Sequence, residues 1–294
     1  MRTDFIVPLS KIASQFYIIA GNHDVYYKDR NDVNALTELI GAYMFCKYFW
    51  EPTDIILSDN TKILMLPWIC RANEEQSFKA IEDTKASVCF GHLQLQGFEM
   101  HKGTYAEEGY KKESFDKFSM VCTGHFHHKS SYNNIHYLGC PFQMNWGDYG
   151  DTKGFHVLDT QTMGLEFVEN PYSLFHKIEY DDTNTTLDAI LNKDFNLFKK
   201  SFVRVNVLRK TNPFWFDSFI EKLETVDPLS IQIIEDNGNL SFEGDMNDII
   251  DVADTFTMLS NYCDSIGVQE VFKPKLKALF QTLYNEANTA RNVQ

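Results

Sequence analysis

Short runs of apolar residues, each followed by a polar turn that contains glycine, dominate the first half of the chain. Runs of four to eight apolar residues bounded by turn residues are typical of buried strands. They predict strands over 16–20, 62–68, 86–90, 118–123, 135–138 and 155–158. Helical patterns fill two of the gaps, at 31–43 and 73–83. Strands that alternate with helices predict a layered α/β domain over residues 1–170.

The second half of the chain has a different pattern. Residues 170–184 are polar and rich in turn formers. Beyond them, 202–207 alternates apolar and polar residues, 230–234 does much the same, and the segment 215–223 between them is helix-like. This order predicts a small β-α-β module over 175–240.

Two apolar stripes at helical spacing follow within 245–290, and they predict a pair of amphipathic C-terminal helices. The stripes contain Ile249, Val252, Ala253, Phe256 and Leu259, and then Leu276, Leu279, Phe280 and Leu283. They are suited either to packing on their own domain or to docking a partner protein. The stretch 235–254 carries seven acidic and no basic residues, which is typical of a solvated surface.

Composition narrows the class of protein. Hydrophobic residues make up 44% of the 294 residues, which excludes a mostly disordered chain. No apolar run approaches the roughly 18 residues of a membrane span. The net charge of −14 argues against a basic nucleic-acid coat protein, but a nuclease with a metal ion or a basic partner remains open. Six cysteines without a C-x-x-C pair favour buried thiols in a reducing compartment.

Three short motifs carry the candidate chemistry. They are Gly21-Asn22-His23-Asp24, Gly91-His92 and Gly124-His125-Phe126-His127, and each follows a predicted strand. The carboxyl ends of parallel strands gather at one edge of a sheet, where ligand sites form. Imidazole nitrogens and carboxamide oxygens are competent ligands for divalent metals. The three motifs together therefore predict a metal site that binds phosphoesters.

The order of these motifs resembles that of the calcineurin-like metallophosphoesterase superfamily. More narrowly, the chain is similar to SbcD-type DNA-repair nucleases, which include the phage recombination endonuclease subunits. The narrower resemblance rests on Leu66-Pro67-Trp68, on Gly97 shortly after Gly91-His92, and on Tyr137-Leu138-Gly139-Cys140-Pro141. It implies a layered α/β/β/α sandwich, N-terminally incomplete here, with a small α+β capping domain that contacts DNA and C-terminal helices.

The resemblance also implies a two-metal site, with manganese as the usual ion. By this resemblance Asn22, His92 and His125 bind one ion, and His127 binds the other. Two such ions polarise the phosphate and stabilise the leaving oxygen.

The catalytic roles implied by the resemblance fall on His23 and Asp24. His23 would contact the scissile phosphate or protonate the leaving oxygen, and Asp24 would orient it. The activity implied is that of a DNA exonuclease and endonuclease subunit in recombination, repair and replication.

The implied partners are DNA, an SbcC-like ABC-type ATPase and a second copy of the chain, with no membrane. The implied location is the cytoplasm, that of the host if a phage encodes the chain. Basic residues in the small module either touch a phosphate backbone or form a solvated face, and they are Lys199, Lys200, Arg204, Arg209 and Lys210.

Two motifs that open the family pattern, D-x-H and G-D-x-x-D, are missing before Asn22. They supply the remaining metal ligands, including the carboxylate that bridges both ions. G-D-x-x-D strings occur only later, at 147–151 and 244–248, and we interpret them as a loop and an acidic surface. Three neutral ligands compensate a divalent ion poorly, so we expect the chain to bind two metal ions weakly or not at all and to lack the turnover of a complete relative. Another metallophosphoesterase, a degenerate assembly subunit and a nonfunctional fragment remain alternatives.

The missing motifs generate a prediction about the gene. We expect in-frame codons for D-x-H and G-D-x-x-D immediately upstream of the start, because the resemblance places the start of the chain just after the second motif. Sequencing the upstream region tests this. Unrelated sequence, or a stop codon without a separate fragment, would contradict it.

Overall fold

The computed structural model describes residues 5–13, 15–41, 43–101, 103–235, 273–277 and 279. The chain divides into two compact units, Met1–Met144 with Asp148–Asp236, and Asn145–Gly147 with Asn237–Gln294. The predicted helix at 249–259 and nearly all of the acidic stretch 235–254 lie outside the described residues. Part of the second predicted C-terminal helix is described, and residues 273–277 and 279 are helical.

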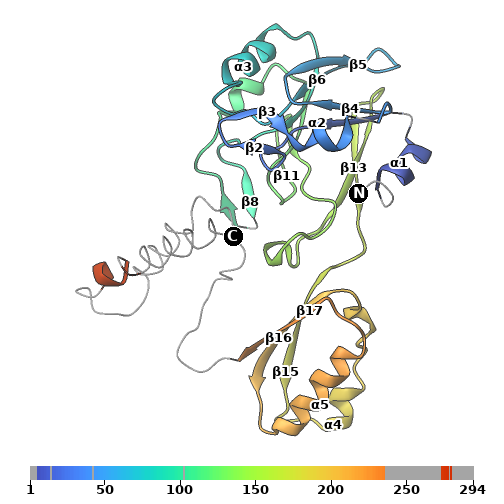
Figure 1. The fold of residues 1–294 in the computed structure, drawn as a ribbon, viewed down its shortest axis with the longest axis vertical. Helices are drawn as coiled ribbons and strands as arrows, with labels where there is room; N and C mark the ends of the chain where they lie inside the picture. Colours follow the sequence, from blue (N-terminus) through green and yellow to red (C-terminus); the bar gives the residue numbers. More distant parts are fainter. Residues whose placement is uncertain are drawn as a thin grey trace. The chain divides into compact units, whose positions relative to one another are not determined.

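The first unit contains a six-stranded sheet with the strand order β11-β12-β10-β7-β6-β5. Figure 1 labels its strands β5, β6 and β11. Strands β6, β7, β10 and β12 run parallel, and β5 and β11 are antiparallel edges. The strands are β5 (Thr53–Ile56), β6 (Lys62–Leu66), β7 (Val88–His92), β10 (Met120–Gly124), β11 (Ser130–Tyr132) and β12 (Ile135–Tyr137). The carboxyl ends of the parallel strands therefore share one edge.

A second sheet of two parallel strands, β1 (Phe16–Ile19) and β4 (Cys46–Phe49), packs on this one. Its side chains alternate between two cores, as the period of a strand requires. Tyr17, Ile19 and Phe49 pack against the apolar face that β6 and β7 present. The opposite face packs on α2 (Ala35–Ile40), which contributes Leu36 and Ile40.

The other face of the six-stranded sheet carries the largest core. Leu64, Cys89 and Val121 are buried there against α3 (Glu74–Asp83), which contributes Ile81. The elements therefore stack in the order helix, sheet, sheet, helix, and the predicted α/β class is confirmed. Within the part of the chain that is described, no helix has the length and apolar character to cross a bilayer.

Three hairpins and several short helical segments accompany these sheets. The hairpins are β2 (Val25–Tyr27) with β3 (Arg30–Asn34), β8 (Glu99–His101) with β9 (Thr104–Tyr105), and β13 (Gly154–Asp159) with β14 (Gly164–Glu169). The helical segments are α1 (Val7–Ile12), η2 (Lys112–Phe115) and η3 (Trp146–Asp148).

The predicted helix over 31–43 is wrong at its start, since residues up to Asn34 belong to β3. The Asn34 side chain accepts a hydrogen bond from the Thr37 amide (3.0 Å) and caps the helix that begins at Ala35. The predicted strand over 155–158 is present, but it pairs in a hairpin outside the six-stranded sheet.

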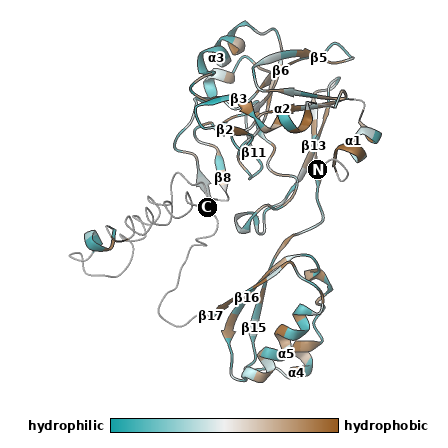
Figure 2. Cartoon of the chain, viewed as in Figure 1, coloured by the Kyte–Doolittle hydropathy of each residue, from teal (hydrophilic) through white to brown (hydrophobic). Residues whose placement is uncertain are grey.

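Residues 175–235, here called the small module, form a parallel sheet of three strands with its own core. Its elements are β15 (Phe175–Asp181), α4 (Leu187–Leu191), η4 (Asn196–Phe198), β16 (Phe202–Arg209), α5 (Pro213–Glu224) and β17 (Ser230–Glu235). Helix α5 alternates hydrophobic and hydrophilic residues (Figure 2), and it buries Phe219 and Leu223. Strand β15 lies entirely within the stretch 170–184, which the sequence pattern indicates to be turn-rich, so that expectation is wrong over 175–181.

The basic residues of the small module are largely engaged within the chain. Arg204 is 1% exposed, and its Nε donates to Gln232 Oε1 (3.1 Å). Two others form surface ion pairs, Lys200 with Asp227 and Lys210 with Glu235. The hypothesis that Arg204 contacts a phosphate backbone is therefore wrong, because its side chain is buried.

A buried carboxylate fixes the start of α5. Asp182 is 4% exposed and accepts hydrogen bonds from the amides of Thr211 (2.7 Å) and Asn212 (2.9 Å). Burial opposes ionisation, but these amides hold the pKa of the Asp182 carboxyl below its usual value. Asn212 in turn caps the helix by accepting from the Phe214 amide (3.1 Å).

We predict that Asp182→Ala lowers the free energy of unfolding by about 1–3 kcal/mol, because buried backbone donors lose their acceptor. Urea denaturation near neutral pH measures the change. Asp217→Ala is the matched control, since Asp217 is an exposed carboxylate on α5 itself. Equal stabilities of the two variants would contradict this account of the α5 start.

Candidate functional site

The three predicted motifs lie at the carboxyl ends of β1, β7 and β10. Strand β7 ends at His92, and His92 pairs in register with Gly124, the last residue of β10. His125 follows directly. The turn after β1 is tied to the end of β6 through the Trp68 amide, which donates to the Ala20 carbonyl (2.8 Å).

Asn22, His92 and His125 meet at this edge. Asn22 Oδ1 lies 2.8 Å from His92 Nε2, and His125 Nδ1 lies 3.4 Å from the same nitrogen. The two imidazole rings are 5.2 Å apart and nearly perpendicular, at 78°. The structure thus brings together the three side chains that the sequence analysis assigns to one ion.

These spacings fit the geometry of adjacent metal ligands. With metal–ligand bonds of about 2.1 Å, ligands separated by about 90–110° lie about 3.0–3.4 Å apart. The distances of 2.8 Å and 3.4 Å are close to this range. Within the described residues, no three His, Cys, Asp or Glu side chains are grouped to hold an ion. The carboxamide of Asn22 is therefore essential to the candidate set.

Two glycines leave room for the His92 ring. A Cβ atom on Gly21 would lie 2.9 Å from His92 Cε1, and one on Gly124 would lie 3.3 Å from His92 Nδ1. A side chain at Gly21 would displace the ring, because such a distance is below van der Waals contact. Steric room for the His92 ring thus explains why the first and third motifs have glycine at these positions.

The surroundings of His92 favour its neutral form. Burial, followed by the nearby His125, His23 and His127, lowers the pKa of His92 to about 3. A neutral imidazole retains the lone pair that metal coordination uses. The backbone of His125 has a φ of +92°, a conformation that L-residues rarely adopt and that is often found at functional sites.

The turn of the first motif is closed by Asp24. Its Oδ2 accepts from the Gly21 amide (2.7 Å), and its own amide donates to the Gly21 carbonyl (3.1 Å). His23 is exposed at this turn and lies near enough to His92 to affect its pKa. Among the described contacts, the Asp24 carboxylate bonds the turn backbone rather than His23. Orientation of His23 by Asp24 stays a prediction.

His127 lies beside a carboxylate that the sequence analysis missed. Its Nδ1 is 3.7 Å from Asp148 Oδ2, and the Asp148 side chain is 1% exposed. Burial works against ionisation, yet His127, Lys153 and the Met144 amide hold the pKa of Asp148 far below its usual value. The interpretation of 147–151 as a loop did not include the burial of Asp148. The spacing G-D-x-x-D alone gave no signal of this burial.

The second G-D-x-x-D string, at 244–248, lies outside the described residues.

His128, which matches none of the three motifs, contacts two carboxylates. Its Nδ1 is 3.0 Å from Asp151 Oδ1, and its Nε2 is 3.4 Å from Glu99 Oε2.

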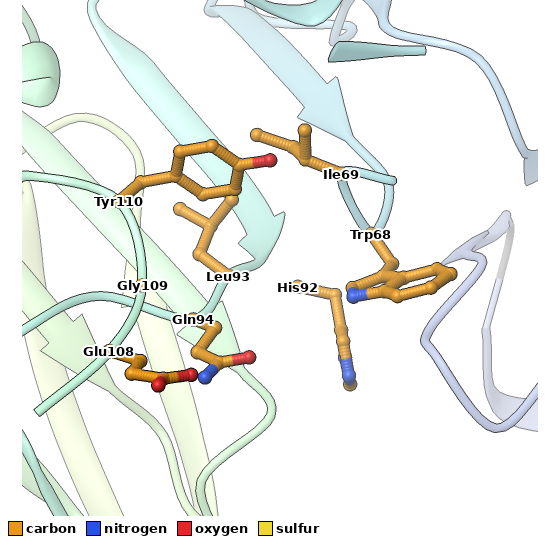
Figure 3. Close-up of a pocket in the computed structure, with 8 residues that line it drawn as sticks. All are labelled: Trp68, Ile69, His92, Leu93, Gln94, Glu108, Gly109 and Tyr110. Atoms are coloured by element: carbon orange, nitrogen blue, oxygen red, sulfur yellow. The ribbon is translucent and has the colours of Figure 1, made fainter. Parts of the chain in front are cut away.

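A pocket of about 310 Å³ adjoins the His92 end of β7. Trp68 and His92 line it together with Gln94, Glu108 and Tyr110 (Figure 3). It therefore offers an aromatic wall and polar groups directly beside the candidate site.

Comparison with known proteins gives two relatives, and no family model matches the chain. The chain is 30% identical over 273 residues to exonuclease subunit 1 of Enterobacteria phage T4, a match that spans 90% of this chain and 74% of that protein. It is also 30% identical over 152 residues to the SbcD subunit of the SbcCD nuclease of Staphylococcus epidermidis, which spans 47% of this chain and 40% of that protein. With this extent of similarity, the chain belongs to the family of SbcD-like nuclease subunits.

Proposed function

We propose that the chain is a subunit of a metal-dependent nuclease that hydrolyses phosphodiester bonds in DNA during recombination and repair. The observation that carries the proposal is the convergence of Asn22, His92 and His125 from the carboxyl ends of three different strands. Family membership supplies the reaction class, since both relatives are named as nuclease subunits. The four stacked layers would then be the core of the metallophosphoesterase sandwich.

In this proposal Asn22, His92 and His125 hold one manganese ion, and His127 holds the second. Bound divalent ions supply Lewis-acid polarisation of a phosphate oxygen. The neutral state of His92 and the steric room at Gly21 keep one imidazole ready for coordination. His125, whose backbone φ is +92°, lies with its Nδ1 3.4 Å from His92 Nε2.

His23 is the proposed proton donor to the leaving oxygen. It is exposed at the mouth of the site, where a substrate can reach it, and imidazole is a suitable acid near neutral pH. Asp24 holds the turn that carries His23 through its bond to Gly21. A phosphodiester bound beside His92 would therefore meet His23 from the solvent side.

The proposed partners are DNA, an SbcC-like ABC-type ATPase and a second copy of the chain, acting in the cytoplasm. Both relatives are named as subunits, which supports an assembly. The segment 245–290 is the proposed docking element for the ATPase. The strongly acidic net charge of −14 fits a nuclease whose positive charge comes from ions and partners.

A second candidate function is that of an assembly subunit with a degenerate metal site. The observation that favours it is the ligand set, because Asn22, His92 and His125 are all neutral. Without a carboxylate the set offsets little of the charge of a divalent ion. Co-purification with an ATPase without manganese-dependent cleavage would support this alternative.

We predict weak manganese binding that depends on the three converging side chains. Calorimetric titration should give a measurable affinity for the unaltered chain and a loss of about tenfold or more in His92→Gln or Asn22→Ala. His176→Gln, an imidazole change in the small module, is the control and should leave the affinity unchanged. Equal affinities in all four proteins would overturn the proposed metal site.

The buried, neutral His92 predicts a pH dependence of stability. Its folded pKa of about 3 lies below the ordinary value of 6.5, so the unfolded state binds more protons across this window. Stability should therefore fall as pH falls below about 6.5, and His92 alone should contribute about 2 kcal/mol of loss between pH 7 and pH 5.

Urea denaturation in a chelating buffer measures this loss for the unaltered chain and for His92→Gln. The pH-dependent difference between them isolates the contribution of His92. If both proteins lose the same stability on acidification, the burial of a neutral His92 is contradicted.

A further inference from the structure

A buried ion-pair cluster lies behind the loop that carries His127. Its centre is Lys153, which is 4% exposed. Lys153 Nζ lies 2.7 Å from Asp148 Oδ1 and 2.8 Å from Asp151 Oδ2, and it donates to the His127 carbonyl (2.8 Å). Burying charges in this way costs desolvation energy and is weak evidence for stability alone. The cluster therefore calls for a role beyond packing.

The Asp148 carboxylate is held on two sides. Lys153 contacts Oδ1, and the Met144 amide donates to Oδ2 (2.8 Å). Oδ2 is also the oxygen that lies 3.7 Å from His127 Nδ1. A hydrogen bond needs about 3 Å, so an approach of under about 1 Å would form one. The carboxylate is thus held on both sides at a short distance from the imidazole.

The carboxylate contacts of His127 differ from those of the next residue, His128. His128 contacts carboxylates through both ring nitrogens, Asp151 at Nδ1 and Glu99 at Nε2. The carboxylate contact of His127 is at Nδ1. His128 is thus held by two carboxylates, whereas His127 faces Asp148 through Nδ1.

We propose that Asp148, fixed by Lys153, is a positioning residue for His127. Its carboxylate accepts the Nδ1 proton of His127 and so presents the Nε2 lone pair to a divalent ion. Carboxylate–histidine pairs of this kind set the tautomer and direction of metal-binding imidazoles. Lys153 also holds the backbone of the loop through the His127 carbonyl. The proposal rests on the proposed metal-dependent function.

The test compares Asp148→Asn with Asp151→Asn in the full chain. Both substitutions remove one carboxylate charge from Lys153, but only Asp148 faces His127. The first readout is the His127 tautomer in the metal-free protein, from the ring nitrogen chemical shifts at about pH 8. His127→Gln assigns the signals, and circular dichroism checks that each variant is folded.

We expect His127 to carry its proton on Nδ1 in the unaltered chain and in Asp151→Asn. In Asp148→Asn the population should shift toward the Nε2–H tautomer, and Asp148→Glu should restore Nδ1–H. The second readout is the manganese concentration that half-broadens the His127 signals. It should rise about 10- to 100-fold in Asp148→Asn and stay little changed in Asp151→Asn.

The positioning role is overturned if the tautomer is the same in all these proteins, or if both Asn variants change it equally. If Asp148→Asn fails to fold, Asp148→Glu and Lys153→Met carry the test, since Lys153→Met should loosen the carboxylate and weaken the tautomer preference. Failure of the proposed function is distinct, because His92→Gln would then leave manganese binding unchanged whatever the tautomer of His127.

Discussion

The parallel register of β7 against β10 is the constraint on which the rest of the structure depends. It sets His92 opposite Gly124, so that the residue after Gly124 begins its loop beside the His92 ring. The left-handed backbone of His125 then turns that imidazole to within 3.4 Å of His92. A slip of one residue in this pairing would separate the two rings and turn strand side chains to the opposite face.

The charge distribution around the site follows from this arrangement. The side chains that converge at the sheet edge are one amide and two imidazoles, whereas in the buried cluster beside His127 the ammonium of Lys153 lies between two carboxylates. One ammonium faces two carboxylates, so Lys153 compensates part of their buried negative charge. The candidate site is therefore a set of one amide and two imidazoles at the ends of β1, β7 and β10, beside a partly compensated ion-pair cluster in the loops that follow β10 and β12.

Much of this can be predicted from the sequence, because apolar runs ending in glycine mark buried parallel strands. The strands predicted over 16–20, 86–90 and 118–123 are present, and the residues at their carboxyl ends do meet. Strand β15 escapes prediction since its apolar residues stand among turn formers in 170–184. The start of α2 is predicted too early because a hairpin strand precedes the cap at Asn34.

The burial of Asp148 could not be predicted from spacing, since it depends on Lys153 reaching back to Asp148 and to the carbonyl of His127. Such a contact is set by tertiary packing rather than by a local pattern. The burial of Arg204 could not be predicted either. It lies in β16, an alternating strand, and sequence alone does not say which face of such a strand is buried.

The most direct test of the account is anomalous diffraction from crystals of the chain soaked in manganese. The account predicts an anomalous peak bonded to Asn22 Oδ1, His92 Nε2 and His125 Nδ1, with distances of about 2.0–2.3 Å. Saturating manganese that gives no peak at this edge of the sheet, or a peak elsewhere only, would contradict it.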